Sequence, residues 1–576
     1  MINQKIAKIL YEISILLDMD DIQFKPRAYE KASLTIQDLN EDLEVIYKKG
    51  GIKAIKEIPS IGEGISRKIE EFIKNGKIKE YEELKEKFPV DIDELKRVEG
   101  LGPKGIKFLY KKLKIKNIEE LERAAKENKL RNFEGWGQKK EDNILKGIEF
   151  IKKGTGRFPL GQVFPLINEI RDRIGSLKEV KKVIIAGSVR RWKETIGDVD
   201  ILVISDNPKP IMEFFTKMPE VGKIYGKGET KSTVKLMNGM DIDIRVVEEK
   251  SYGAALNYFT GSKEHNVALR QIAKDKGLKL SEYGLFKGNK FIAGRTEEEL
   301  YKTLGLRYIE PELRESHGDE IKAAKENKLP RLINYDELKG DLQVQTNWTD
   351  GSNSIKEMAL EAKKYGLQYI VITDHTKTLA MTGGLKEKDL IQQGKEIARI
   401  NKELNGIRIF KGAEVNILKD GSLDINDETL EQLDVVGIAV HSNFNMSKED
   451  MTNRIIKAMK NKHADILFHP TGRIIHKREP FQVDMDKIIK MAIETNTILE
   501  IDAYPDRLDL NDEYIKKAIK MGAKLSIDSD AHNIKHFDFL KFGIAQARRG
   551  WAAKNDIINT MGLKEFEGYI NQKRQR

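Results

Sequence analysis

Residues 336–576 alternate between short apolar runs and helical patterns, and this alternation constrains the fold more than any other feature of the sequence. The runs, in chain order, are YIVIT, RIFKGAEV, LDVVGIAV, ADILF, TILEI and KLSID. Strands that alternate with helices form parallel sheets, and this number of repeats suits a closed or nearly closed barrel. The sequence therefore predicts a parallel α/β barrel in this part of the chain.

Two other patterns precede the barrel. Residues 1–155 repeat apolar positions at helical spacing between charged ones. From about residue 181, the strand-like runs VKKVIIAG, DVDILVIS and MDIDIRVV are interleaved with helices. Residues 311–340 are polar, contain two prolines and lack a strong apolar period, which is typical of a linker. A chain of 576 residues also exceeds what one core usually organises, so we predict several domains.

The composition of the chain excludes several kinds of chemistry. The chain has 0 cysteines, which excludes disulfides, thiolate nucleophiles and thiolate metal sites. Its formal net charge of +10 favours an anionic partner without identifying one. The start, MINQKIAKILYEISILLDMDDIQF, reads as an amphipathic helix, and no later segment approaches 18 uninterrupted apolar residues. We expect a soluble cytoplasmic protein that does not enter a membrane.

A Gly-x-Gly turn occurs three times in the helical region, in IPSIGEG, VEGLGPK and FEGWGQK. Backbone amides at such a turn, beside a helix N-terminus, bind a phosphate whatever the base sequence. One copy would be an ordinary glycine-capped hairpin, but three copies, two followed by basic residues, favour DNA. These turns resemble helix-hairpin-helix motifs. The DNA-contacting residues predicted from them are Gly62, Gly64, Gly100, Gly102, Lys104, Gly135 and Gly137.

Acidic residues on two strand-like runs form the most informative pattern. Asp198 and Asp200 lie two apart and therefore on one face of a strand, and Asp243 lies on a run that we expect beside it. Such acids repel one another unless a cation lies between them, and Mg²⁺ prefers carboxylates together with substrate phosphates. Three acids can hold two ions for in-line phosphoryl transfer. Ser188 and Arg191 are then placed to bind a triphosphate.

With the segment YFTGSKEHN at residues 258–266, the chain resembles the family X DNA polymerases. The resemblance implies a nucleotidyltransferase palm in which Asp198, Asp200 and Asp243 are the catalytic metal-binding acids, with Mg²⁺ or Mn²⁺ as the ion. It also implies a thumb, whose aromatic pair and glycine line the sugar of the incoming nucleotide. The nucleotide-binding residues it implies are Ser188, Arg191, Gly197, Tyr258, Phe259, Gly261, Lys263, Asn266 and Arg270.

Two basic residues of this region need separate mention. Lys263 departs from the acidic residue of vertebrate polymerase beta, and it either contacts the incoming nucleotide or is simply solvated. Arg245, two residues beyond the third acid, is predicted to contact DNA.

Lys68 lies one helical turn after the first hairpin. A lysine there is usually a solvated cation, but a partly desolvated amine near DNA can attack a sugar aldehyde as a Schiff-base nucleophile. The family X resemblance places Lys68 on the lyase lysine, with Lys25, Tyr29 and Lys31 in the 5′-phosphate pocket. A 5′-deoxyribose phosphate or AP lyase activity is therefore a further prediction.

Histidines gather late in the chain, where seven of the 9 lie at residue 375 or beyond. Several end a short apolar run, as in VITDHT, GIAVHS, DILFHP and LSIDSDAH. The C-terminal strand ends of a parallel barrel open on one face, where catalytic groups collect. A single strand-end histidine is more often structural than a ligand. Four of them, with Asp350, Glu414 and Asp530, indicate a polynuclear metal site.

This half of the chain resembles the PHP (polymerase and histidinol phosphatase) domain, a distorted (β/α)7 barrel. The order of the two halves resembles the bacterial and archaeal PolX architecture. The PHP resemblance implies three Mn²⁺ or Zn²⁺ ions that activate a hydroxide for phosphoester hydrolysis. It assigns Glu414, His441 and His469 to one metal, and Asp350, His375 and His532 to a second.

The remaining metal poses a problem. The family's first motif has the form His-x-His, and this chain has Gln343 and Gln345 in its place. Glutamine offers a neutral amide, a poorer ligand than imidazole for Zn²⁺ or Mn²⁺. Glu414 and Asp530 hold that metal weakly, substrate phosphate oxygens complete the site, or the site stays empty.

The resulting prediction is a multidomain α+β and α/β protein, a monomer associated with the nucleoid. We expect a DNA-dependent DNA polymerase that uses dNTPs to fill short gaps in gapped or nicked DNA during base excision repair, with a PHP 3′-5′ exonuclease or AP endonuclease. The predicted boundaries are 1–85 for a lyase-like helical domain, 86–155 for helix-hairpin-helix fingers, 156–250 for the palm, 251–315 for the thumb, 316–335 for a linker and 336–576 for the PHP domain.

Three alternatives stay open. A template-independent nucleotidyltransferase would share the Gly-Ser and Asp-x-Asp patterns, but would not need the hairpins or the thumb segment. A catalytically silent scaffold that binds DNA gaps would not need the three acids. A polymerase with a silent, structural PHP domain would keep the palm chemistry alone.

Overall fold

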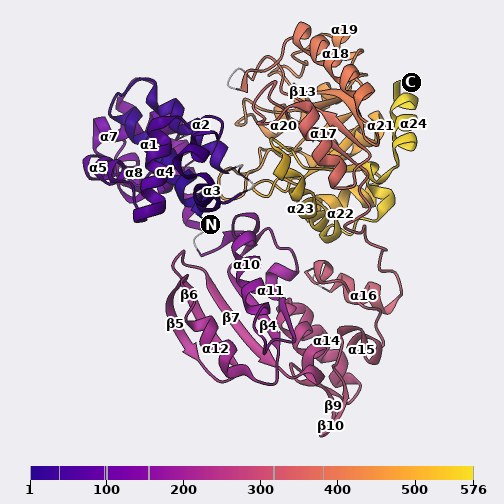
Figure 1. The fold of residues 1–576 in the computed structure, drawn as a ribbon. Helices are drawn as coiled ribbons and strands as arrows, with labels where there is room; N and C mark the ends of the chain where they lie inside the picture. Colours follow the sequence, from indigo (N-terminus) through magenta and orange to yellow (C-terminus); the bar gives the residue numbers. More distant parts are fainter. Residues whose placement is uncertain are drawn as a thin grey trace. The chain divides into compact units, whose positions relative to one another are not determined.

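The computed structural model describes residues 2–37, 39, 41–96, 98, 101–153, 156–315, 318–379 and 382–574 (Figure 1). The chain forms two compact units, Met1–Thr155 with His476–Arg478, and Gly156–Ile475 with Glu479–Arg576. Each unit is described by itself. Within the described ranges, no helix has the combination of length and apolarity that a membrane span requires.

The first unit is helical, as its apolar period predicts. Its buried stripe includes Leu10, Leu16, Ile69 and Leu109, which are all 0% exposed and form one core. The helices are α1 Ile2–Met19, α2 Lys25–Gln37, α3 Leu43–Lys56, α4 Glu63–Asn75, α5 Lys79–Lys87, α6 Ile92–Lys96, α7 Pro103–Leu113, α8 Ile118–Lys126, η1 Leu130–Asn132 and α9 Gln138–Lys153.

The second unit begins with a five-stranded mixed sheet in the order β2-β4-β7-β6-β5. The central strands β4 and β7 are parallel neighbours, and the other pairs are antiparallel. Alternate residues of β7 are buried, so one face of the sheet packs on a core and the other carries polar side chains. The elements of this palm segment are β1 Phe158–Pro159, α10 Leu160–Gly175, β2 Lys182–Ile185, α11 Gly187–Arg190, β3 Thr195–Ile196, β4 Asp198–Ile204, α12 Pro208–Thr216, β5 Val221–Lys227, β6 Lys231–Leu236 and β7 Asp241–Val247.

The thumb segment pairs short helices with a small antiparallel sheet, ordered β10-β9-β8. The polar segment expected as a linker is not an extended connector, because Ile321 and Ala324 of α16 are buried in the same core as the thumb helices. The elements are η2 Glu249–Ser251, α13 Tyr252–Thr260, α14 Lys263–Asp275, β8 Lys279–Ser281, β9 Gly284–Lys287, β10 Lys290–Ala293, α15 Glu297–Thr303, η3 Pro311–Leu313 and α16 Asp319–Lys325.

Seven parallel strands, in sequence order, form the barrel. The first and last strands meet beyond their ends, where Gln345 N donates to the carbonyl of Ala531 at 2.8 Å, so the barrel is nearly closed. All residues of β11, β12, β14 and β16 are buried, as expected for strands covered by helices. The strands are β11 Gly340–Val344, β12 Tyr369–Ile372, β13 Arg408–Asn416, β14 Val435–Ala439, β15 Ile466–Leu467, β16 Ile498–Asp502 and β17 Leu525–Asp528.

Helices follow most barrel strands, and local signals set their starts. The first begins with a capping box, in which Ser354 accepts from the backbone of Glu357 and the Glu357 side chain accepts from Ser354 in return. The helices are α17 Ile355–Lys364, α18 Glu387–Glu403, α19 Asp427–Leu430, α20 Lys448–Met459, α21 Met485–Thr495, α22 Asp512–Met521, η5 Ile534–Phe539, α23 Leu540–Arg549, η6 Lys554–Asp556, η7 Ile558–Thr560 and α24 Leu563–Arg574.

Within the second unit, the palm and the barrel share buried contacts. Leu508 and Phe542 of the barrel belong to the same core as the palm residues of α10 and β4. Arg473 binds Glu194 through two guanidinium nitrogens, and Gln546 donates to the same carboxylate at 2.7 Å. The loop between α11 and β3 is therefore held from the barrel side.

Candidate functional site

The three predicted palm acids lie on neighbouring parallel strands. Asp198 and Asp200 share one face of β4, and the register pairs Asp200 with Asp243 of β7. Asp198 is exposed, whereas Asp200 and Asp243 are half-buried. The fold therefore brings these carboxylates to one place.

Asp200 lies very close to Gly187, a position at which the local geometry requires glycine. Gly187 has a φ of +60°, and a Cβ at this position would lie 2.4 Å from Oδ2 of Asp200. A side chain here would thus be strained in its backbone and would collide with the Asp200 carboxylate. The Gly-Ser pattern before the basic residues is explained by this close approach.

Burial and charge repulsion both raise the pKa of Asp200. Burial, and then the nearby Asp198 and Asp243 carboxylates, raise the pKa of Asp200 to about 7. Lys231 of the next strand lies 3.1 Å from Asp243, so one cation already faces the group. A divalent ion between the carboxylates would relieve the remaining repulsion.

A pocket of about 720 Å³ opens beside these acids and is lined by all nine residues predicted to bind nucleotide. Tyr258 and Phe259 stand edge to face, 5.2 Å apart, and the Asn266 side chain donates to the carbonyl of Tyr258 at 2.7 Å. The sequence did not single out Arg157, Lys193 and Thr195, which also line the pocket.

The two residues predicted to bind a triphosphate have distinct environments. The Arg191 guanidinium donates to Glu315 and to the Thr260 carbonyl. Ser188 Oγ is buried and, across the part of the chain that the structure describes, has no hydrogen-bond partner. An acceptor or donor from a ligand would satisfy it. Arg245 lies off this pocket lining, with its guanidinium 5.5 Å from the Phe259 ring centroid.

We expect Mg²⁺ binding to the palm to release about one proton at pH 6 and almost none at pH 8.5. A raised carboxylate pKa disfavours the charged form, which is the form that binds the ion, so affinity should weaken as the pH falls below about 7. Titration calorimetry in two buffers of different ionisation enthalpy measures the released protons. The release at pH 6 should be missing in Asp200→Asn and retained in Asp206→Asn, whose exposed carboxylate pairs with Lys181. Equal release from wild type and Asp200→Asn would contradict the assignment.

In the first unit, Lys68 of α4 lies in a small polar cluster. Its amine pairs with Glu80, and the Tyr29 hydroxyl donates to the same carboxylate at 3.2 Å. Tyr29 is buried, while Lys25 and Lys31 of α2 are exposed. The predicted lyase lysine and one pocket residue are therefore together, and Glu80 is a partner that the sequence did not indicate.

The hairpin glycines present an open surface. A Cβ at Gly62, Gly64, Gly102, Gly135 or Gly137 would meet nothing within 4 Å, so packing inside the unit does not explain these residues. Of these five, only Gly135 has a positive φ, at +76°. Gly62 caps the N-terminus of α4, and Gly102 caps the N-terminus of α7. Helix α7 also carries the exposed Lys104. Gly100 lies outside the described residues.

Glu414 of β13 is the centre of the barrel site. It is 1% exposed, and its Oε1 lies 2.8 Å from Nε2 of both His441 and His469. His375 Nδ1 lies 3.4 Å from Oε2. Burial raises the pKa of Glu414, but the nearby His375 and His441 and the hydrogen bonds from His441 and His469 outweigh it and hold that pKa well below its ordinary value.

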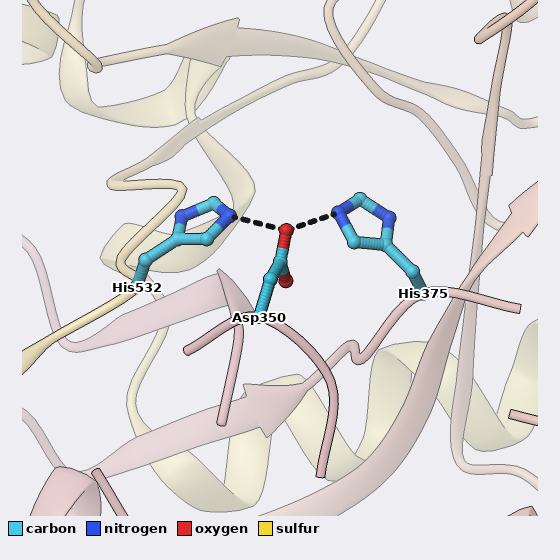
Figure 2. A group of neighbouring side chains, drawn as sticks. All are labelled: Asp350, His375 and His532. Carbon is cyan, nitrogen blue, oxygen red and sulfur yellow. Dashed lines mark ion pairs between the residues drawn. The ribbon is translucent and has the colours of Figure 1, made fainter. Parts of the chain in front are cut away.

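The second predicted ligand set is also assembled. Figure 2 shows one carboxylate oxygen of Asp350 between two imidazoles, 3.5 Å from His375 Nε2 and 3.6 Å from His532 Nε2. The ligand atoms of this trio all lie within 4.8 Å of one another, and so do those of His375, Glu414 and His441. His375 therefore lies between the two sets.

The second set already carries opposite charges in close contact. Burial opposes the charged ring of His532, but the carboxylates of Asp530 and Asp350 outweigh it and raise its pKa to about 10. Ion binding at this ring must therefore displace a proton.

A neighbouring amide orients one imidazole. His441 Nδ1 donates to the side-chain oxygen of Asn416 at 2.7 Å, so Nε2, on the side of Glu414, is the ring nitrogen that remains for a metal ion. The donor sets of both trios, imidazole and carboxylate, fit Mn²⁺ or Zn²⁺. The sequence did not indicate Asn416, because it follows the ligand Glu414 by two positions on the same strand without a motif of its own.

The two positions of the PHP family's His-x-His motif hold glutamines here, and their side chains act as hydrogen-bond donors. Gln343 and Gln345 are fully buried, and both donate from Nε2 to Glu414 Oε2, at 3.1 and 2.8 Å. Asp530, the remaining predicted ligand, faces Arg507, whose Nε lies 4.0 Å from Oδ2. These residues do not present the donor set that a third ion would need.

Four segments of the chain match known families. Residues 255–315 match the DNA polymerase beta thumb family, and residues 341–503 match the PHP domain family. Residues 1–78 match a helix-hairpin-helix domain, and residues 92–149 a SAM-like helix-hairpin-helix tandem.

A relative matches the chain over almost its whole length, and two further proteins match part of it. The chain is 36% identical over 572 residues to the DNA polymerase/3′-5′ exonuclease PolX of Bacillus subtilis (strain 168), covering 98% of this chain and 99% of that protein. A probable phosphatase of Thermoanaerobacter sp. (strain X514) is 28% identical over 235 residues, covering 39% of this chain and 90% of that protein. A crystal structure of the ternary P/T complex of Leishmania infantum polymerase beta matches with 24% identity and a TM-score of 0.26, covering 39% of this chain and 97% of that one.

The fold, the acid-lined pocket and the matched domains together define a class of protein. It is a polymerase of the nucleotidyltransferase class joined to a PHP barrel. At 36% identity over almost its whole length, the chain belongs to the PolX group of family X DNA polymerases with a C-terminal PHP domain.

Proposed function

We propose that the palm adds nucleotides from dNTPs to the primer end of short DNA gaps, in a template-directed repair reaction. The observation that carries this proposal is the convergence of Asp198, Asp200 and Asp243 beside the pocket that all nine nucleotide-binding candidates line. The Bacillus subtilis relative is named a DNA polymerase, which supports the same activity here.

Each palm residue has a role in this proposal. The three aspartates hold two Mg²⁺ or Mn²⁺ ions, which supply charge neutralisation for the primer hydroxyl and the triphosphate. Arg191, kept in place by Glu315, and the unpartnered Ser188 hydroxyl bind phosphate oxygens. Tyr258 packs against the sugar.

Gap filling on a defined substrate tests the activity. Extension of a primer across a one-nucleotide gap should follow the template base and should fail without a template strand. Equal extension without template would favour the template-independent nucleotidyltransferase. A chain that binds the gap and adds nothing would favour the silent scaffold.

For the first unit we propose contact with the DNA backbone through the open hairpin glycines and a lyase reaction at Lys68. The open space at Gly62 and Gly102, each beside a helix N-terminus, supports close approach of a phosphate. For the lyase reaction the Lys68 amine must first give up its proton, and the paired Glu80 carboxylate is its nearest acceptor.

Borohydride should trap a covalent adduct between the wild-type chain and an abasic DNA substrate, and the adduct should be absent in Lys68→Ala. Only an amine that forms a Schiff base with the sugar aldehyde can be trapped in this way. Lys74→Ala, on the same helix and exposed, should trap normally. An equal yield of adduct from Lys68→Ala would place the nucleophile elsewhere.

For the barrel we propose a Mn²⁺- or Zn²⁺-dependent phosphoesterase that removes nucleotides from DNA 3′ ends, with AP endonuclease activity as a second outcome. The relatives named 3′-5′ exonuclease and probable phosphatase support phosphoester chemistry. His375, His441, His469 and His532 hold the ions, which supply an activated hydroxide, and Glu414 and Asp350 balance their charge.

The wider role follows from these parts. We propose base excision repair as the process and a cytoplasmic, nucleoid-associated monomer as the working form. The domain limits stay as proposed from the sequence, at residues 1–85, 86–155, 156–250, 251–315, 316–335 and 336–576.

A further inference from the structure

Buried nitrogen donors fill the part of the barrel site where three-metal chemistry would need a third ion. Gln343 and Gln345 are 0% exposed, and both point Nε2 at Oε2 of Glu414. A cation on that oxygen would have to displace both amides. If the amides turned over, their oxygens would face the carboxylate, an arrangement that is unfavourable without an ion.

A guanidinium lies beside two other acids of the barrel site. Arg507 follows β16, and its Nε is 3.5 Å from Oδ2 of Asp502 and 4.0 Å from Oδ2 of Asp530. The guanidinium of an arginine stays protonated in proteins. Arg507 is therefore a permanent positive charge beside the acids that a third ion would otherwise join.

The cluster has unmet hydrogen-bonding capacity. Arg507 Nη1 and Asp530 Oδ1 are buried and, among the residues described, have no hydrogen-bond partner. The Arg507 side chain as a whole is 21% exposed. An arginine donor without a partner suits an anionic oxygen, because guanidinium groups bind phosphate oxygens well.

We propose that the barrel site of this chain binds two metal ions, and that Arg507 takes the place of the third as the cation that binds a phosphate oxygen of the substrate. This inference rests on the proposed phosphoesterase function of the barrel. Gln343 and Gln345 are then not weakened ligands, since their amides neutralise Glu414 Oε2 and make the third ion unnecessary.

The first test is the metal content of the full-length chain. The protein is stripped, loaded with Mn²⁺, desalted and measured by elemental analysis in an Asp198→Asn background, which removes ion binding by the palm. We expect two Mn²⁺ per chain. Three ions would show that the glutamines or water complete a third site and would overturn the proposal, as would fewer than two.

The second test measures inorganic phosphate binding to the same Mn²⁺-loaded protein by titration calorimetry. Arg507→Met should weaken the affinity at least about tenfold without changing the two bound ions, and Arg507→Lys should recover part of the loss. Arg399→Met is the matched control, because Arg399 is an exposed arginine of α18 paired with Glu403. Unchanged phosphate affinity in Arg507→Met would overturn the proposal. If that variant fails to fold, the lysine variant and the ion count decide.

The proposed phosphoesterase function and the proposed role of Arg507 can be contradicted independently of each other. Release of nucleotides from a 3′-labelled DNA strand tests the phosphoesterase itself. A chain that releases none, yet holds two ions and loses phosphate binding with Arg507, would contradict the proposed function and leave the cation assignment in place.

Discussion

Asp198→Asn is expected to reduce nucleotide addition about a thousandfold or more. Asparagine keeps the shape of the side chain but removes one of three carboxylates that converge at the pocket. Without that charge the site holds its ions poorly, and the developing charge on the triphosphate is no longer balanced. DNA binding should change little, because the hairpins proposed to grip the backbone belong to the first unit.

Single-nucleotide incorporation into gapped DNA, at saturating dNTP and Mg²⁺, measures this effect. Asp206→Asn provides the control, because Asp206 follows the same strand but points to an exposed pair with Lys181. Normal gap filling by Asp198→Asn would remove the basis for the palm assignment.

The second large effect is expected from Glu414→Gln in the barrel. Oε1 of this carboxylate lies 2.8 Å from both His441 and His469, so Glu414 belongs to the predicted metal position that these two histidines share. The neutral amide should release Mn²⁺ and lower 3′-end nuclease activity at least about a hundredfold, since even residues that only orient metal ligands cost ten- to a hundredfold. Gap filling should persist.

The measurements are Mn²⁺ content and release of 3′-terminal nucleotides, with circular dichroism to confirm folding. Glu428→Gln, an exposed glutamate of α19, should leave both unchanged. Full nuclease activity in Glu414→Gln would place the chemistry outside the barrel. A wild-type chain without any nuclease would favour the structural barrel.

The sequence predicted the fold class well, because its signals are local. The runs YIVIT through KLSID all became barrel strands, since a buried parallel strand must be apolar along its whole length. Asp198 and Asp200 could be placed on one face from strand period alone. The nine pocket residues came from motif resemblance, and the structure brings them together around one pocket.

Other contacts lie outside the reach of sequence patterns. Glu315 was part of a segment expected to end the thumb, yet it binds the Arg191 guanidinium 124 positions away. Glu80 beside Lys68, and Lys231 beside Asp243, are equally ordinary charged residues in the sequence. The polar segment after residue 315 hides a helix whose few apolar residues are buried by the thumb.

The sequence alone predicts which residues could carry chemistry: three acids, a Gly-Ser turn proposed to bind phosphate, and a row of strand-end imidazoles. How those groups are balanced depends on contacts that form only in the folded chain. Arg507 lies near Asp530 of the next strand end, and Asn416 contacts His441 of the next strand end. These pairs form because the barrel brings the ends of neighbouring strands together. Electrostatic pairing depends on distance in space, and a sequence pattern records only distance along the chain.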